Sequence, residues 1–155
     1  MTSAECDRLL QSSLTLLPKS LDTRAARRQL IAIGLQESRL VYREQIGGPA
    51  RGLWQFERGG GVKGVLTHLA TAATAARACD ALGVLSTPEA VYQTLSSNDT
   101  LAACFARLLL WTDPAPLPDS SEQGWNCYIR TWRPGKPHAH TWAGFWKLAQ
   151  EAARE

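Results

Sequence analysis

One carboxylate stands on a helical face that should be buried. Residues 30–40 read LIAIGLQESRL, a mostly apolar run in which Glu37 falls four residues after Ile33 and seven after Leu30. In an α-helix these three positions share one face. A carboxyl group on an apolar face is desolvated, which raises its pKa and suits it to act as a general acid. The alternative is a helix-end glutamate that turns into water or pairs with a nearby arginine.

An irregular, glycine-rich segment follows Glu37 directly. Helical periodicity is lost between about residues 40 and 62, where the GGP of residues 47–49, Gly52 and the Gly59–Gly61 run favour turns and one short hairpin. Since no Lys-Ser/Thr follows the Gly59–Gly61 run, a flexible lead into the next helix is expected there instead of a phosphate-binding loop. A loop of about twenty residues inside a compact domain is unusual and usually functional.

Two short motifs bracket the first part of this segment. They are Glu37-Ser38 and Gly52-Leu53-Trp54-Gln55. They resemble the Glu-Ser and Gly-Leu-Met-Gln motifs of the lytic transglycosylase family, with Trp54 in place of methionine. The compact chain looks most like the bacteriophage cell-wall lysins of this lysozyme-like superfamily.

A third family motif, roughly Ala-Tyr-Asn-Ala-Gly, is matched less closely. Its nearest counterpart is WNCYIRTWRPG at residues 125–135. Either Asn126 takes the asparagine position, or Tyr128 supplies the hydroxyl from the next helical turn. Whichever residue does so would close the far side of the site and position Glu37 or the sugar. The resemblance spans roughly residues 22–135.

The resemblance implies a reaction as well as a fold. The fold is the all-α lysozyme-like domain, here a single domain over residues 1–155, and the reaction cleaves the β-1,4 bond between N-acetylmuramic acid and N-acetylglucosamine in peptidoglycan. Glu37 would protonate the leaving oxygen. The sugar's own 6-hydroxyl would then attack, and the ionised Glu37 would remove its proton, which leaves a 1,6-anhydro end. No second carboxylate, metal or cofactor is needed.

The same resemblance gives roles to the residues around Glu37. Ser38 would hydrogen-bond near the carboxyl group or to the substrate's N-acetyl group. Gln55 would contact polar groups of the sugar, and Gly52 would let the backbone approach closely. Trp54 would offer an apolar face to a pyranose ring, or fill the core. We expect Glu37 and Gln55 to face one groove.

Three alternatives stay open. If Glu44 or Glu57 faces Glu37 across a cleft, with room for a water between them, the enzyme could be an inverting muramidase. A small DNA-binding module could use the helical face of residues 24–28, which carries Arg24, Arg27 and Arg28; a solvated face is the default for these arginines. The third alternative is an inactive lysozyme-like protein kept for structure in a virion.

The helices that must position these residues follow from periodicity and capping signals. Thr2 and Glu5 have the spacing of a capping box, Asp22 is the expected N-cap of the next helix, and Asn98 that of a later one. Pro88 opens a short helix. Counting the Ala-rich stretch from about Val62 to Leu82 and two aromatic-rich helices near the end, we expect six or seven helices and no strand of any length. The expected segments are residues 2–17, 22–38, 62–82, 88–95, 99–111, 125–132 and 141–155.

The charge and the cysteine and histidine content limit the partners, disulfides and metal sites that we expect. Its net charge of +3 suits an anionic partner but is too small to indicate nucleic acid. We expect the four cysteines to be buried apolar residues, with a disulfide or two as the alternative. His138 and His140 are a weak metal signal, because no other ligand has suitable spacing.

No secretory signal and no membrane span is evident in the sequence. We therefore expect a monomer made in the cytoplasm of a bacterial host. Its partner would be the glycan strands of peptidoglycan, which it would reach through a holin-type partner or within a virion.

Overall fold

The structure is a computed structural model that describes residues 1–154, and this part of the chain holds eight α-helices and no strand. The prediction of an all-α protein is confirmed. The helices are α1 (Ser3–Ser13), α2 (Arg24–Ser38), α3 (Lys63–Thr67), α4 (Ala72–Ala81), α5 (Pro88–Thr94), α6 (Asp99–Trp111), α7 (Ser121–Trp132) and α8 (Ala139–Ala152). The prediction of six or seven helices was too low, because a turn at residues 68–71 divides the Ala-rich stretch into α3 and α4.

Local side-chain caps start most of these helices where the sequence predicts. Thr2 and Glu5 form the capping box of α1, and Asn98 caps α6. The N-cap of α2 is Thr23, whose hydroxyl accepts a hydrogen bond from the amide of Ala26, so the prediction of Asp22 was wrong by one residue.

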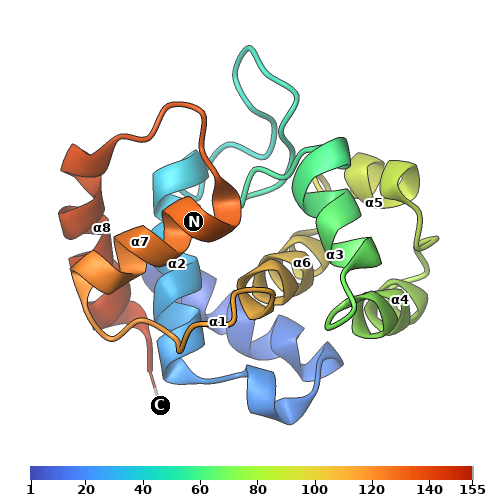
Figure 1. Cartoon of the computed structure of the whole chain (residues 1–155), viewed down its shortest axis with the longest axis horizontal. Helices are drawn as coiled ribbons and strands as arrows, with labels where there is room; N and C mark the ends of the chain where they lie inside the picture. Colours follow the sequence, from blue (N-terminus) through green and yellow to red (C-terminus); the bar gives the residue numbers. More distant parts are fainter. Residues whose placement is uncertain (155) are drawn as a thin grey trace.

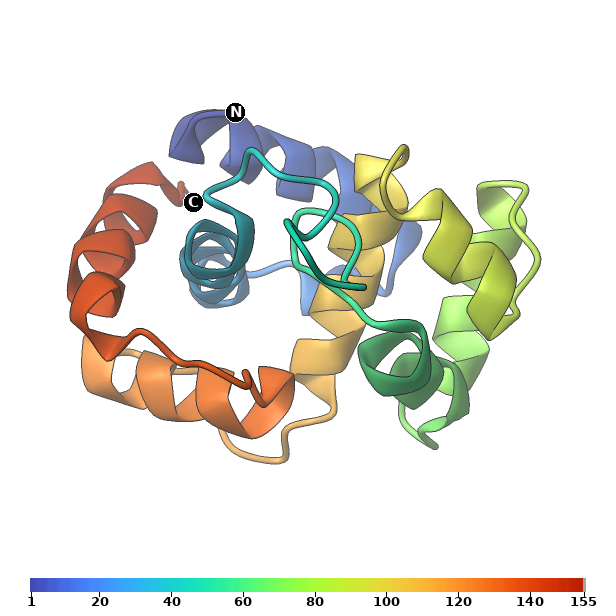
Figure 2. The ribbon, with the colours of Figure 1, turned by 90° about the horizontal axis from the view of Figure 1, so that it is seen from above.

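Helix α6 runs through the middle of the molecule (Figures 1 and 2), in contact with α1, α2, α3 and α4. Helices α2, α7 and α8 lie on one side of it, and α3, α4 and α5 on the other. In both views the segment between α2 and α3 passes across the junction of these two groups, and part of it protrudes as an open loop at the top of Figure 1.

Helix α2 is buried on most of its surface. Leu30, Ile31 and Ile33 are fully buried, and the helix packs against α1, α6 and α8. A helix enclosed in this way leaves its last turn as the place where a polar side chain can reach the surface. Glu37 occupies that last turn.

Of the three arginines at the start of α2, Arg24 is exposed, Arg28 is half-buried and Arg27 is buried, so the expected solvated face is wrong for Arg27. Arg27 is buried and binds Asp7 and Asp22 at 2.6 and 2.8 Å. Arg24 donates to the carbonyl of Ala153, and Arg28 to that of Pro118. These hydrogen bonds anchor distant segments to α2, and they use donors that a nucleic acid would otherwise need.

The cysteines and most late aromatic residues belong to the core, as predicted. All four cysteines are buried and free. Trp142 and Trp146 of α8 are buried, while Trp125, Trp132 and Phe145 pack against the core and stay partly exposed. None of the helices in residues 1–154 has the length and apolar character needed to cross a membrane.

Candidate functional site

The carboxyl group of Glu37 is half-buried at the end of α2. Its Oε1 accepts a 2.6 Å hydrogen bond from the hydroxyl of Tyr128 in α7. Burial raises the pKa of Glu37 to about 7, because the charged form loses hydration, and the Tyr128 hydrogen bond opposes this rise by stabilising the carboxylate. No group within residues 1–154 hydrogen-bonds the second oxygen, Oε2. The group can therefore hold or release a proton near neutral pH.

Tyr128 is held firmly enough to fix the orientation of Glu37. Its ring is buried and stacks on Trp142, with centroids 5.4 Å apart and planes at 11°. Trp125 packs on the same ring at 5.5 Å. Burial and the neighbouring carboxyl raise the pKa of the Tyr128 hydroxyl, so it stays a proton donor to the hydrogen bond.

Of the two candidates for the third motif, Tyr128 is the one that contacts Glu37. Asn126 lies two residues earlier, about 200° around the helix, and its side chain is exposed. Of these two residues, Tyr128 is therefore the one that lies beside the carboxyl group.

Ser38 holds the loop in place instead of reaching a substrate. Its side chain is buried, and its hydroxyl donates to the carbonyl of Leu53 at 2.6 Å and accepts from the amide of Leu40. The predicted direct contact with an N-acetyl group is not available to a hydroxyl enclosed in this way. Ser38 instead ties the first motif to the second, since Leu53 belongs to the latter.

Trp54 fills the core, so of its two predicted roles the sugar-stacking one is wrong. The indole is 1% exposed, and its Nε1 donates to the carbonyl of Leu30 at 2.8 Å. Gly34, in the middle of α2, makes room for Leu40 and Trp54, because a Cβ there would lie 2.6 Å from Cδ2 of Leu40 and 3.3 Å from Nε1 of Trp54.

Gly52 and Gln55 shape the end of the loop. Gly52 has a φ of +79°, and a Cβ there would lie 3.3 Å from the carbonyl oxygen of Leu95, so its predicted close backbone approach is to α5 and not to a substrate. Gln55 also has a positive φ, and its side-chain amide donates a hydrogen bond to the carbonyl of Gly52 at 2.9 Å. The loop contains isolated bridges at Arg51, to Glu44 and to Phe56, in place of the expected hairpin.

Gln55 lines a pocket with a volume of about 690 Å³. The pocket lies between the C-terminal end of α7, the end of α6 and the turn that leads into α3. Its lining residues are Gln55–Glu57, Gly59–Gly61, Gly64, His68, Leu109, Thr112–Pro114 and Arg130–Arg133. The Gly59–Gly61 run thus forms one wall, within an irregular helical turn at Arg58–Val62.

Trp132 lines this pocket and also bonds to the loop, a role that was not foreseen from the sequence. Its Nε1 donates to the carbonyl of Trp54 at 2.9 Å, and its ring lines the pocket. Trp132 lies four residues after Tyr128 on the same face of α7. Glu37 itself is not among the lining residues, so the prediction that Glu37 and Gln55 face one groove is not confirmed. Glu37 ends α2, and its hydrogen-bond partner Tyr128 lies one turn before the pocket residue Trp132 in α7.

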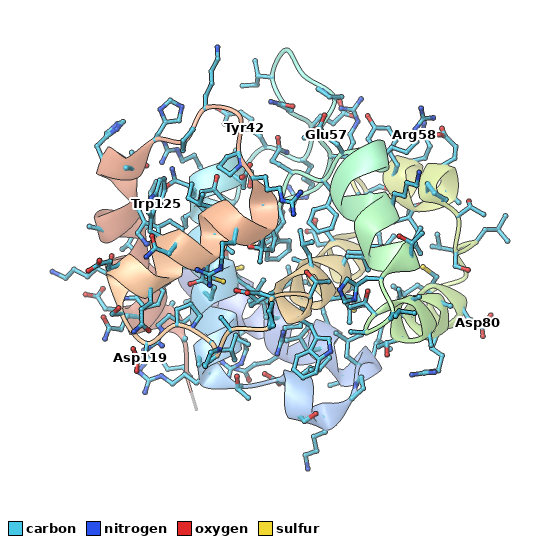
Figure 3. The ribbon with its side chains drawn as sticks, viewed as in Figure 1. Tyr42, Glu57, Arg58, Asp80, Asp119 and Trp125 are labelled. Carbon is cyan, nitrogen blue, oxygen red and sulfur yellow. The ribbon has the colours of Figure 1, made fainter. Side chains whose placement is uncertain are left out.

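The other acidic residues near the site have different surroundings. Glu44 lies in the protruding loop, is mostly exposed and is 3.8 Å from Arg51. Glu57 is exposed and lines the pocket, and Figure 3 shows it on the opposite side of the loop base from Tyr42. Asp113 also lines the pocket, but Arg130 binds its carboxylate at 2.9 Å.

Unusual backbone conformations gather around this site. Within residues 1–154, four residues other than glycine have a positive φ: Arg39 and Leu40 just after Ser38, and Gln55 and Arg133 in the pocket wall. Such conformations cost about 1–2 kcal/mol per residue, and they often accompany functional sites. Here they stop α2 and α7 abruptly and turn the chain around the Glu37–Tyr128 pair.

The two histidines near the start of α8 do not line the pocket, and the His138 carbonyl accepts a hydrogen bond from Gln36. The rings of His138 and His140 are 6.0 Å apart, and no group of three possible metal ligands occurs in residues 1–154.

Comparisons with protein-family models, with curated proteins and with solved structures found no match. The chemistry of the site therefore has to be argued from its own residues.

Proposed function

We propose that this protein is a peptidoglycan lytic transglycosylase of the phage lysin type. The observation that carries the proposal is the Glu37 carboxyl group, which has a pKa of about 7 and is oriented by the Tyr128 hydroxyl, one helical turn before the pocket residue Trp132. A general acid works best when its pKa lies near the working pH. The order of the Glu37-Ser38 and Gly52–Gln55 motifs supports the same family.

The reaction needs one group that first gives and then takes a proton. Protonated Glu37 donates its proton to the oxygen of the β-1,4 bond as the carbon–oxygen bond breaks. The carboxylate that remains then removes the proton of the 6-hydroxyl as that oxygen bonds to the anomeric carbon. The glycan is left with a 1,6-anhydro-N-acetylmuramic acid end, and Glu37 regains its proton.

The tyrosine hydrogen bond supports both halves of this cycle. Tyr128 donates to Oε1 whether Glu37 is neutral or ionised, so the carboxyl group keeps its orientation while the proton leaves and returns. Oε2 is the oxygen available for exchange with the substrate. Gln55 and Trp132 offer an amide and an aromatic face to a sugar chain along the pocket.

A hydrolytic muramidase is the second candidate, and Glu57 is the observation that favours it. This carboxylate is exposed and lines the pocket, so it could activate a water. An inverting enzyme needs its two carboxyl groups far enough apart to hold that water between them and the sugar. Glu44, out on the protruding loop, is less suited to the role.

Solubilisation of purified peptidoglycan by single variants tests the assignment. We expect Glu37→Gln to lower the rate by at least about 10²-fold, because the amide cannot donate an acidic proton. Glu44→Gln serves as a matched control and should keep the wild-type rate. A wild-type protein that solubilises nothing would refute the enzyme, and an active Glu37→Gln would refute the catalytic residue.

Delivery to the cell wall is a separate part of the proposal. We propose that the protein acts as a monomer on glycan strands after release by a holin-type partner or from a virion. Its Glu37 site would then meet peptidoglycan from the periplasmic side. Fractionation of infected cells before and after membrane permeabilisation would test this route.

A further inference from the structure

A second pocket, with a volume of about 470 Å³, adjoins the first. It lies between the end of α6, the α6–α7 connection and the turn between α3 and α4. The two pockets share His68, Thr112, Asp113 and Pro114, so they form one continuous depression. Nothing in the proposed reaction at Glu37 requires this second part.

A buried arginine lines the second pocket. Arg107 of α6 is 2% exposed, and its Nε donates to the carbonyl of Leu21 at 2.7 Å. Its guanidinium carbon lies 5.7 Å from the centroid of the Trp111 ring. Its Nη1 is buried and has no hydrogen-bond partner. Leaving a buried charged donor unpaired is costly, so the group is prepared for an acceptor that is not part of the described chain.

The charge of Arg107 is also poorly balanced inside the protein. Within residues 1–154 it forms no ion pair; the carboxylate of Asp22 acts on it, but Arg27 already binds that carboxylate at 2.8 Å. Burial lowers the pKa of Arg107 to about 10, so the group is still a cation at neutral pH. A positive group at the base of a pocket favours an anionic ligand.

The rest of the pocket restricts the kind of anion. One part of its wall is made of small apolar groups, from Ala70, Pro114, Ala115 and Pro116, beside the half-exposed ring of Trp111. Larger apolar and polar side chains complete the lining, from Leu110, Leu117, Ser20, His68 and Thr112. The small apolar part fits methyl-sized side chains. The planar guanidinium fork matches a carboxylate in shape.

We propose that this pocket binds a carboxylate carried on a small apolar residue, with Arg107 as its partner. In the substrate, this carboxylate belongs to the short alanine-containing peptide attached to muramic acid. The identity of the substrate rests on the proposed function, whereas the carboxylate site itself does not. A glycan strand in the first pocket would place its peptide over the shared residues and into the second.

One acidic residue faces the proposed site and does not prevent anion binding. Asp113 lines both pockets, but its carboxylate accepts hydrogen bonds from Arg130 at 2.9 Å and from the amide of Ala115 at 3.2 Å. The Arg130 charge offsets it. The Arg107 charge therefore remains the one that a ligand meets.

The carboxylate site can be tested by NMR titration of the full chain with N-acetyl-D-alanine. We expect saturable shifts of the Arg107 Nε–H and Thr112 amide signals, and none with the uncharged N-acetyl-D-alaninamide. Ala115→Glu, an exposed position at the rim, should weaken binding by at least about tenfold, because its carboxylate competes for Arg107. Ala115→Gln fills the same space without the charge, so it should weaken binding much less than Ala115→Glu does. Both variants avoid the core, unlike Arg107→Gln, which removes a buried hydrogen bond to Leu21.

Several results would overturn the carboxylate site. One is binding of N-acetyl-D-alaninamide as tight as that of N-acetyl-D-alanine, and another is shifts that do not saturate. Two more are equal affinities of the two Ala115 variants for N-acetyl-D-alanine, and inorganic phosphate that binds as tightly as N-acetyl-D-alanine. The last would indicate a general anion site.

Cleavage rates on two kinds of glycan test separately whether the bound carboxylate belongs to the substrate's peptide. Ala115→Glu should lower the ratio of cleavage rates on peptide-bearing and peptide-stripped glycan more than Ala115→Gln does; an unchanged ratio in Ala115→Glu would refute the link. If the wild type cleaves neither glycan, the proposed function fails, and the NMR titration still decides the carboxylate site.

Discussion

The Tyr128 hydroxyl and the Glu37 carboxyl group meet at 2.6 Å, although 91 positions separate the two residues in the chain. Tyr128 comes from a helix whose aromatic face is stacked on Trp142 of α8. Glu37 ends the buried helix α2. Because both partners are fixed by packing, the hydrogen bond sets the direction of the carboxyl group and moderates its raised pKa.

Tyr128→Phe should raise the pKa of Glu37 further, because the hydrogen bond it removes stabilises the carboxylate. The enzyme that we propose needs protonated Glu37, so its rate should fall as the pH rises through about 7. In Tyr128→Phe this alkaline fall should move to higher pH, together with a lower maximal rate. The measurement is a pH–rate profile paired with a ¹³C NMR titration of the Glu37 carboxyl carbon. Asn126→Ala, an exposed change in the same helix, is the control that should leave both curves in place.

Folding stability should also depend on the protonation of Glu37. Its pKa is raised by folding from 4.5 to about 7, so the folded state binds the proton more tightly than the unfolded state. This contribution is fully present below pH 4.5, is lost as the pH rises to about 7 and then stays constant. Its upper limit is about 3 kcal/mol.

Glu37→Gln removes this dependence, since the amide does not titrate. The stability of Glu37→Gln minus that of the wild type should therefore grow between pH 4.5 and 7 and level off above. Urea unfolding at a series of pH values measures it. A difference that stays constant across this range would show that the carboxyl group is not desolvated.

Trp54 should behave as a core residue. Trp54→Ala removes a fully buried ring and its hydrogen bond to the Leu30 carbonyl, which should cost about 3–5 kcal/mol of unfolding free energy. Tyr42→Ala, at a ring that is 48% exposed, should change stability by no more than about 0.5 kcal/mol. Thermal unfolding compares the two. If Trp54→Ala were as stable as the wild type and bound glycan more weakly, the indole would be a sugar platform after all.

Local signals in the sequence predicted the elements, because capping is a contact between near neighbours. The hydroxyl of Thr2, the amide of Asn98 and the ring of Pro88 each start a helix as expected. The half-buried Glu37 was also predictable, from apolar periodicity alone. Asp22 was misassigned because Thr23 offers an equally good cap one residue later.

Contacts between distant segments could not be predicted in this way. Arg27 was expected in solvent, but Asp7 and Asp22 bind it inside the fold. The partner of the Trp54 indole is a backbone carbonyl in another helix, which no spacing reveals. The choice between Asn126 and Tyr128 depends on which face of α7 is turned toward Glu37, and the sequence does not give that rotation. Trp132 has the spacing of a core residue. Its partial exposure to the pocket is visible only in the structure.

The central claim, that Glu37 cleaves glycan without a second carboxylate, is tested most directly by digesting purified peptidoglycan in ¹⁸O-labelled water. Mass spectrometry of the released fragments then reports which oxygen closed the new end. Intramolecular attack by the 6-hydroxyl predicts 1,6-anhydro-N-acetylmuramic acid ends that contain no label, with no such product from Glu37→Gln. Reducing ends that carry ¹⁸O, and that disappear in Glu57→Gln, would contradict this account and identify a hydrolytic muramidase.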